Sequence, residues 1–104
     1  MKIAREEIFG PVLAAITVKD AEEAVKVGNA SIYGLAAAVW TGDVTRAHRI
    51  GRALRSGLVY VSCYDAEGIT VPFGGFKQSG TGRDKSLHAF DKYTELKTTW
   101  IDLS

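Results

Sequence analysis

The feature that most constrains this chain is the alternation of short apolar runs with amphipathic runs. The apolar runs lie at 12–18, 35–40 and 58–62, and they contain few polar residues, namely Thr17 and Ser62. Runs of this length predict buried strands. The amphipathic runs between them predict two helices, beginning at Asp20 and Asp43, because an aspartate side chain accepts hydrogen bonds from the free N–H groups of a first helical turn. The resulting order βαβαβ predicts a parallel α/β sheet with helices on both faces and right-handed crossovers.

Two local signals refine the helix boundaries. Glu23 follows Asp20 by three residues, which is close to the spacing of a capping box. Gly57 follows the second amphipathic run and is predicted at the C′ position, where a left-handed conformation ends many helices.

After Ser62 the pattern changes to an irregular, glycine-rich stretch over residues 63–83. Irregular segments of this length inside a compact domain are usually functional. We expect a short helix over 83–91 and then a strand within 93–103, in which Leu96, Thr98 and Trp100 share one face. A strand in that position must pair either within its own chain or with another chain.

Charge and cysteine content limit the classes of function. The chain has 13 basic and 12 acidic residues and a formal net charge of +1, so nothing in its charge predicts nucleic acid or an anionic membrane as a partner. No apolar run reaches the roughly 18–20 residues that span a bilayer. Cys63 is the single cysteine, which excludes an internal disulfide and fits a reducing cytoplasm. His48 and His88 lack companions with ligand spacing, so no metal site is predicted.

Three motifs carry a resemblance to a known family. They are EEIFGPV at 6–12, YGLAAAVW at 33–40 and PFGGFKQSGTGRD at 72–84. In this order and spacing they resemble the aldehyde dehydrogenase superfamily, and the loop 70–73 with the run 84–89 most resembles the branch that oxidises γ-glutamyl-γ-aminobutyraldehyde. The resemblance implies a C-terminal portion of such an enzyme. Residues 1–92 would be the βαβαβ part of the catalytic domain, and residues 93–104 would be an oligomerisation strand.

The resemblance also implies what this chain lacks. In the family, a cysteine thiolate attacks the aldehyde, hydride passes to NAD or NADP, and water hydrolyses the thioester. The nucleophile, the base, the oxyanion-hole asparagine and the dinucleotide-binding domain all lie upstream of the segment matched by EEIFGPV. We therefore expect no catalytic residue here, no cofactor bound to the isolated chain and no dehydrogenase activity from it, since the rate depends on bringing thiolate, aldehyde and nicotinamide together.

Two residues match the cofactor side of the family site. Glu7 corresponds to the glutamate that holds the nicotinamide-side ribose, and an ionised carboxylate can accept both hydroxyls of a diol. Phe9 corresponds to the aromatic residue beside the nicotinamide, where it would orient the ring and exclude water. The alternative is that Glu7 is a solvated surface acid and Phe9 is ordinary core.

The stretch 64–73 corresponds to the wall of the aldehyde entrance, with Phe73 as an apolar wall residue. Glu67 stands where many relatives have an aromatic residue, and together with Asp65 it favours a substrate that carries an ammonium group. The alternative is that both acids face water. Cys63 is interpreted as a small buried hydrophobe and not a nucleophile, because the residues that follow it, Tyr64 and Asp65, supply neither a base partner nor a positive charge that would activate a thiol.

The glycines of residues 74–82 do not fit a phosphate-binding loop, since the required lysine and hydroxyl residue do not follow, and we read them as tight turns. In the family this segment leads to the subunit interface, so Arg83 and Asp84 are expected near it and a homo-oligomer is expected through the terminal strand. A competing hypothesis from another class is a stand-alone interaction module that uses the same fold to bind a partner.

Overall fold

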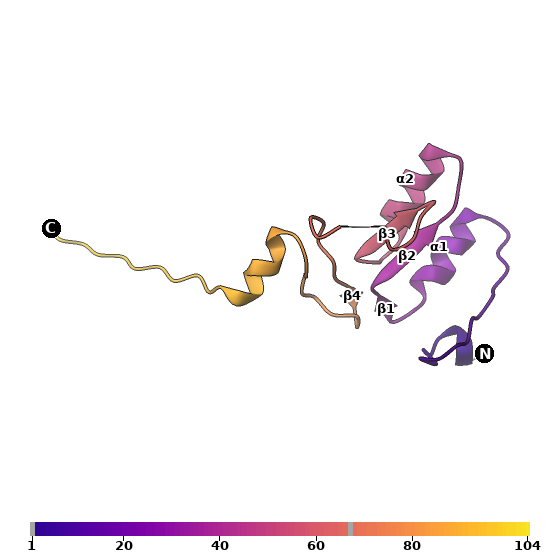
Figure 1. The fold of residues 1–104 in the computed structure, drawn as a ribbon, viewed down its shortest axis with the longest axis horizontal. Coiled ribbons are helices and arrows are strands. Elements are labelled where there is room, and N and C mark those ends of the chain that lie inside the picture. The colour runs from indigo at the N-terminus through magenta and orange to yellow at the C-terminus, as the bar shows by residue number, and fades with distance from the viewer. Residues whose placement is uncertain (1, 67) are drawn as a thin grey trace.

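The computed structural model describes residues 2–66 and 68–104. It has a small α/β body, a loop region and an extended C-terminal segment (Figure 1). Its dimensions of 70 × 33 × 25 Å reflect that segment, which projects away from the body. The elements are η1 (Lys2–Ala4), α1 (Ala21–Asn29), β1 (Tyr33–Gly34), β2 (Ala36–Val39), α2 (Val44–Ala53), β3 (Leu58–Val61), β4 (Phe76–Lys77) and η2 (Leu87–Tyr93).

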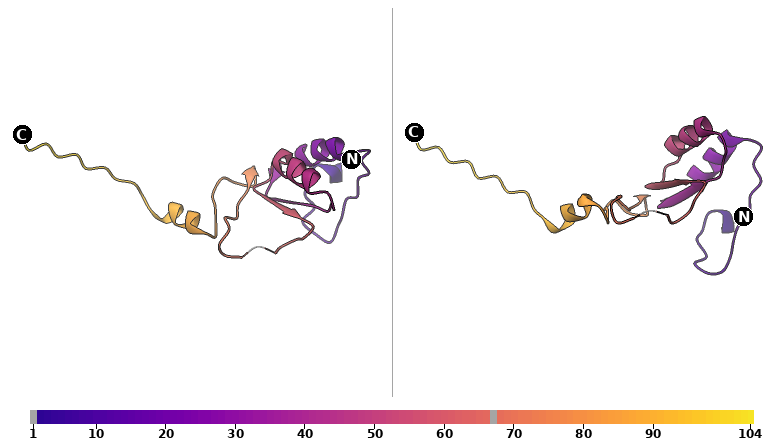
Figure 2. Two further views of the ribbon diagram at one scale, coloured as in Figure 1. Left: turned by 90° about the horizontal axis from the view of Figure 1, so that it is seen from above. Right: turned by 45° about the horizontal axis from the view of Figure 1, so that its top comes forward.

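The centre of the body is a β2–α2–β3 unit, as the sequence predicts. β2 and β3 are parallel, with Ala36 opposite Leu58 and Val39 opposite Val61. The helix α2 packs on both strands, and α1 lies beside α2 (Figure 2). Among the described residues, the buried hydrophobic side chains are Ala47, Ile50 and Tyr60.

Both helices begin where their aspartates predict. The Asp20 carboxylate accepts a hydrogen bond from the Glu23 N–H at 2.8 Å, and the Glu23 carboxylate accepts one from the Lys19 N–H at 2.8 Å. This is a capping box with its second bond shifted by one residue. Asp43 accepts from the Arg46 N–H at 3.0 Å, and this backbone hydrogen bond lowers the pKa of the Asp43 carboxyl.

The strand predicted over 12–18 does not form among the described residues, so the predicted βαβαβ unit is reduced to βαβ. Its apolar side chains are instead exposed, including Val12, Leu13 and Ile16. A strand needs a neighbouring edge that supplies hydrogen-bond partners, and no strand of the described chain lies beside this one. The prediction of helices on both faces is also wrong, since α1 packs against α2, the helix that packs on β2 and β3 (Figure 2).

The glycine-rich region contains a second small sheet. β1 and β4 are antiparallel, with Tyr33 opposite Lys77 and Gly34 opposite Phe76. A further bridge joins Phe73 and Asp84 through backbone bonds of 2.8 and 2.6 Å. The loop is therefore tied to the end of the βαβ unit.

Gly57 is not at the C′ position predicted for it. Leu54 is the C-cap of α2, with its N–H bonded to the Ile50 carbonyl, so the helix ends before Gly57. The reason for a glycine there is a close approach: a Cβ on Gly57 would overlap the carbonyl oxygen of Gly74.

The C-terminal third differs from the prediction in detail. The expected helix over 83–91 is a 3₁₀ helix that begins at Leu87, after Ser86 accepts a bond from the His88 N–H at 3.3 Å. Residues 94–104 run as an extended segment that pairs with no strand of the described chain (Figure 1). In the part of the chain that the structure describes, no helix is long and apolar enough to cross a membrane.

Candidate functional site

A cavity of about 310 Å³ lies between the N-terminal arm and the β1–β4 sheet. One wall is formed by residues 3–7, including Glu7, and the other by Ser31, Tyr33, Leu35 and Ser79. The arm is turned by the Arg5 and Glu6 N–H groups, which both donate to the Lys2 carbonyl. The opposite wall is fixed by the Gly34 N–H, which donates to the Ser79 hydroxyl at 3.0 Å.

Glu7 and Phe9 also line one smaller hollow of about 260 Å³, formed within residues 3–14. Both side chains are exposed, and Phe9 is 92% exposed with a left-handed φ of 52°. No hydrogen bond or ion pair within the described residues occupies the Glu7 carboxylate. The structure therefore brings the two residues together, with Phe9 fully outside the core.

The residues predicted at the substrate entrance are only partly brought together. Asp65 is exposed, with a left-handed φ of 53°, on the loop after β3. Phe73 is half-buried, and the Lys85 ammonium lies 5.3 Å from the centre of its ring, in the range of a cation–π contact. Glu67 lies outside the described residues. A nearby apolar hollow of about 560 Å³ is lined by residues 69–70, 85–87 and 89–90, and neither Asp65 nor Phe73 is part of its lining.

Arg83 organises the glycine-rich turn, a role that the sequence analysis did not predict. Its Nη1 donates to the carbonyls of Gly75 and Gly82 at 2.9 Å each and contacts that of Thr81 at 3.3 Å. Its guanidinium also lies 5.3 Å from the centre of the Phe76 ring. The sequence does not reveal these contacts, because backbone carbonyls occur at every residue. The glycines predict the turn, but they do not predict that Arg83 holds it.

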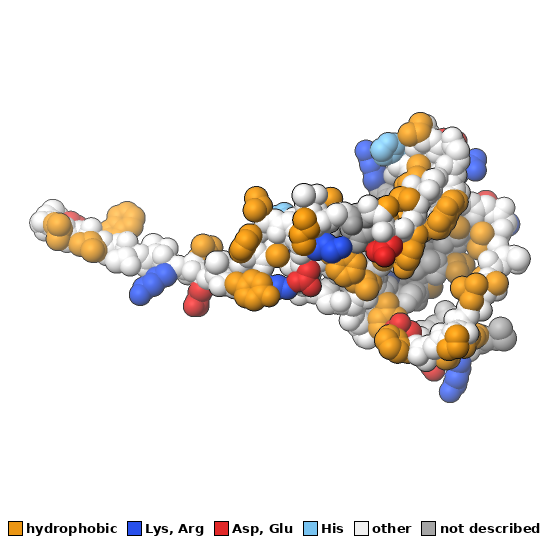
Figure 3. All heavy atoms as spheres, viewed as in Figure 1, with side chains coloured by type: hydrophobic (Ala, Val, Ile, Leu, Met, Phe, Trp, Pro, Cys, Tyr) orange, Lys and Arg blue, Asp and Glu red, His pale blue; other side chains and the backbone are white. Residues whose placement is uncertain are grey.

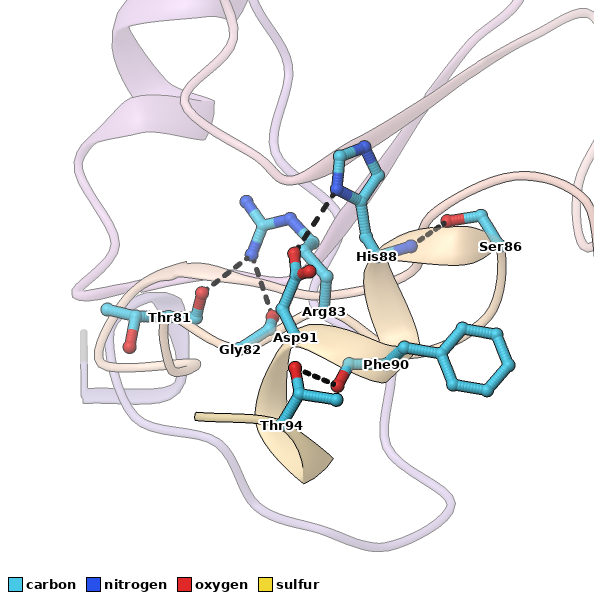
Figure 4. A network of polar contacts seen from close by, with 8 residues as sticks. All are labelled: Thr81, Gly82, Arg83, Ser86, His88, Phe90, Asp91 and Thr94. Atoms are coloured by element: carbon cyan, nitrogen blue, oxygen red, sulfur yellow. Dashed lines mark hydrogen bonds and ion pairs between the residues drawn. The ribbon is translucent and has the colours of Figure 1, made fainter. Parts of the chain in front are cut away.

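Figure 4 shows the polar contacts around this turn and the 3₁₀ helix that follows. His88 Nδ1 lies 3.5 Å from an oxygen of Asp91, and Thr94 donates to the Phe90 carbonyl at 3.2 Å. Asp84 forms an ion pair with Lys92, and the hydrogen bond between them raises the pKa of the Lys92 ammonium. The described residues contain no group of three or more His, Cys, Asp and Glu side chains that could hold a metal ion.

Lys77 and Asn29 form a second network that the sequence analysis missed. The Lys77 ammonium donates to the carbonyls of Asn29 and Ser31 at 3.0 and 2.9 Å. The Asn29 side chain donates to the Ala53 carbonyl and accepts from the Arg55 N–H, at 2.8 and 2.7 Å. The exits of α1 and α2 are thus tied to β4.

Cys63 is exposed and unpaired, so its interpretation as a small buried hydrophobe is wrong. It follows β3 directly, where the chain turns out of the sheet through Ser62, which has a φ of 52°. Because that turn carries the thiol away from the buried strand, the apolar packing expected for it is not available.

Comparison with known proteins identifies the family. The family model described as "Aldehyde dehydrogenase family" matches residues 1–99. The NADP/NAD-dependent aldehyde dehydrogenase PuuC of Escherichia coli is 58% identical over 101 residues, which cover 97% of this chain and 20% of that protein.

Two solved structures agree with this chain in backbone as well as sequence. An indole-3-acetaldehyde dehydrogenase of P. syringae, in complex with NAD+ and IAA, superposes with a TM-score of 0.93 at 65% identity, over 99% of this chain and 21% of that one. The γ-glutamyl-γ-aminobutyraldehyde dehydrogenase of Burkholderia cenocepacia gives a TM-score of 0.90 at 63% identity, over 94% and 20%. The chain spans about a fifth of the length of these relatives. Its sequence and backbone both place it in the aldehyde dehydrogenase family.

Proposed function

We propose that this chain works as one part of an NAD(P)-dependent aldehyde dehydrogenase that oxidises an aldehyde to a carboxylic acid. The match of residues 1–99 to the family is the observation that carries this proposal. The chain would supply one side of the cofactor site and part of the aldehyde entrance. The nucleophile and most of the dinucleotide site would come from the remaining four fifths of the enzyme.

Glu7 and Phe9 are the residues we assign to the cofactor. The Glu7 carboxylate is exposed and has no partner among the described residues, so both oxygens can accept hydrogen bonds from a ribose diol. Phe9 lines the same hollow with a fully exposed ring, which can cover one side of a flat heterocycle. The bound nicotinamide would supply the hydride acceptor, while these two residues would bind and orient it.

A chimeric enzyme tests whether this chain works as part of an aldehyde dehydrogenase. In it, this chain replaces the matching segment of the E. coli relative, which is 58% identical. We expect the chimera to reduce NAD or NADP in the presence of an aldehyde, and the isolated chain to show no activity. A chimera that keeps the fold and assembly of the E. coli enzyme yet has no activity would contradict the proposal.

Glu7→Gln in that chimera tests the role of the carboxylate. Loss of hydrogen bonds to a charged group should raise the KM for the cofactor about ten- to hundredfold. Glu22→Gln, at an exposed position on α1, is the matched control and should leave the KM unchanged. Equal cofactor KM values for the two variants would remove Glu7 from the site.

We also propose that the substrate carries an ammonium group. Asp65 is exposed on the loop after β3, where its carboxylate is free to attract a cation. The sequence assigns Glu67 to the same role. The chimera should have a higher kcat/KM for an amino-aldehyde than for a plain alkanal of equal length, and Asp65→Asn with Glu67→Gln should remove the difference. Equal kcat/KM values for the two substrates in the unsubstituted chimera would contradict this.

A second candidate function, association through the C-terminal segment, is favoured by the exposure of residues 94–104. Leu96 is fully exposed and Trp100 is 90% exposed, on a segment with no strand partner in the described chain. Figure 3 shows hydrophobic side chains along this projection. An unpaired extended segment of this kind is a template for pairing with another chain. We therefore assign it to a homo-oligomer contact, or to a partner if the chain acts as a stand-alone module. We also propose a cytoplasmic location, which the single cysteine, Cys63, supports.

The mass of the purified chain in solution, measured by light scattering at two concentrations, tests this contact. We expect a dimer or larger closed assembly that Leu96→Ser with Trp100→Ser converts to monomer. Trp40→Ser, at another exposed tryptophan, is the control and should leave the assembly intact. A chain that is monomeric at both concentrations would show that the segment makes no such contact.

A further inference from the structure

We propose that Lys77 is a positioning residue, which holds the wall of the cavity that faces Glu7. Lys77 lies within the motif at 72–84, but the motif alone assigns its side chain no role. Its side chain nevertheless turns back to the protein, where the ammonium donates to the carbonyls of Asn29 and Ser31 at 3.0 and 2.9 Å. Fixing an exposed lysine side chain on two backbone acceptors costs conformational entropy, so we infer that these hydrogen bonds have a structural role.

The two carbonyls belong to the exit of α1. Asn29 is the last residue of that helix, and Ser31 lies two residues beyond it. The Asn29 carbonyl, at the end of the helix, has no intrahelical partner and carries partial negative charge, and the Ser31 carbonyl lies in the turn that follows. The Lys77 ammonium supplies both the missing donor and the complementary charge.

The backbone around Lys77 holds the same segment from the other side. Lys77 pairs with Tyr33 across the β1–β4 sheet, and the Gln78 N–H donates to the Ile32 carbonyl at 3.1 Å. Lys77 has a left-handed φ of 55°, which is strained for a residue with a side chain. The main chain at 77–78 and the side chain of Lys77 therefore both bind residues 29–33. The strained backbone at Lys77 directs its ammonium toward the two carbonyls.

Residues 29–33 contribute to the cavity wall opposite Glu7. Ser31, Tyr33 and Ser79 face the arm 3–7 across the cavity of about 310 Å³. Lys77 touches neither Glu7 nor the cavity lining through its ammonium, apart from the Ser31 carbonyl. Its effect on any ligand of Glu7 must therefore pass through the position of this wall, and the functional half of this inference rests on the proposed cofactor role of Glu7.

Hydrogen exchange of the chain itself tests the structural half. The Tyr33, Gly34 and Gln78 amides donate hydrogen bonds near the contacts of Lys77, to Ser31, Ser79 and Ile32 respectively. Lys77→Met should speed their exchange while leaving the amides near the start of α2, such as Ala47, unchanged. Lys77→Arg, which retains a cation, should restore part of the protection. Lys26→Met is the control, because Lys26 is exposed on α1 and makes no contact of this kind within the described residues.

Kinetics of the chimera test the functional half. Lys77→Met should raise the KM for NAD or NADP about tenfold and leave kcat within about twofold, since a displaced wall weakens binding without touching the reacting atoms. Lys77→Arg should recover part of the loss, and Lys26→Met should behave as the unsubstituted chimera.

The outcomes separate this inference from the proposed function. Equal exchange in Lys77→Met and Lys26→Met, or equal acceleration at α2 and at Tyr33, would overturn the positioning role whatever the chimera does. An inactive chimera would count against the proposed function, and exchange would then decide the role of Lys77 alone. Selective exchange combined with an unchanged cofactor KM in an active chimera would overturn the link to Glu7.

Discussion

The carbonyl oxygen of Gly74 lies so close to Gly57 that a Cβ on Gly57 would overlap it. The two glycines come from different parts of the fold, one just before β3 and the other in the turn that Arg83 anchors. Their contact brings the glycine-rich loop against the βαβ unit. The backbone approach, and not an unusual φ angle, is what requires glycine at residue 57.

Gly57→Ala and Gly51→Ala should therefore change stability in opposite directions. An overlap with backbone cannot relax through a side chain, so Gly57→Ala should destabilise the chain by about 1–3 kcal/mol. Gly51 lies inside α2 with open space around its Cα, so alanine there should stabilise the helix by up to about 1 kcal/mol. Urea titration of the helical circular dichroism signal orders the variants. A Gly57→Ala midpoint at or above that of the unsubstituted chain would contradict the overlap.

Arg83 should not be replaceable by lysine. Its guanidinium combines hydrogen bonds to the Gly75 and Gly82 carbonyls with a position over the Phe76 ring, and an ammonium cannot reproduce both. Arg83→Met should destabilise the chain by about 2 kcal/mol, the typical value for hydrogen bonds to a charged group. Arg83→Lys should recover little of this in the same urea titration. Arg52→Met, at an exposed position on α2, is the control, and an Arg83→Lys variant as stable as the unsubstituted chain would refute the argument.

Asp43 should make the stability of α2 depend on acid pH. Its pKa is lowered in the folded chain, chiefly by the hydrogen bond from the Arg46 N–H, so its contribution is present above the unfolded pKa and is lost as the pH falls through the folded one. The helical signal should decline below about pH 4, the usual range of an aspartate. Asp43→Asn keeps an acceptor without the charge, so its own decline should be smaller. Superimposable acid titrations of the two proteins would show that the charge does not matter.

Lys92 should act at the opposite end of the pH scale. Its pKa is raised above the ordinary lysine value by the hydrogen bond to Asp84, so its contribution is present below the unfolded pKa and is lost as the pH rises through the folded one. Both side chains are substantially exposed, so the effect should be small and screened by salt. Lys92→Met should be slightly less stable than the unsubstituted chain at neutral pH and low salt. The difference should vanish at about 1 M salt, and a salt-independent difference would point to lost packing instead.

The parts of the fold that sequence reasoning predicts are those with local causes. Asp20 and Asp43 begin their helices because an N-cap acts within a single helical turn. The β2–α2–β3 unit is predicted because the two apolar strands pair with each other and the helix between them is close in sequence. The segments 12–18 and 94–104 have the composition of strands but no neighbouring edge within the described chain. Composition reports the tendency of a segment to pair, and it carries no information about where the partner lies.

The candidate site shows the same division. Glu7 and Phe9 could be named from a contiguous motif, and the structure brings them to one hollow. Lys77 could not be named, because its partners are backbone carbonyls at the exit of α1, far away in the sequence, and every residue type offers such carbonyls equally. Such contacts become visible only in three dimensions.

The open shape of the chain has a calorimetric consequence. Its radius of gyration is 18.6 Å, against about 13 Å for a compact domain of this length. Because the heat capacity change of unfolding follows the apolar area withdrawn from water, its value for this chain alone should be far below the roughly 1.2–1.5 kcal/mol/K of a compact 100-residue domain. Its melting should be broad, and its peptide bonds should stay open to proteases until another surface covers the segments 12–18 and 94–104. Sharp melting and protease resistance would then be properties of the assembly and not of these residues alone.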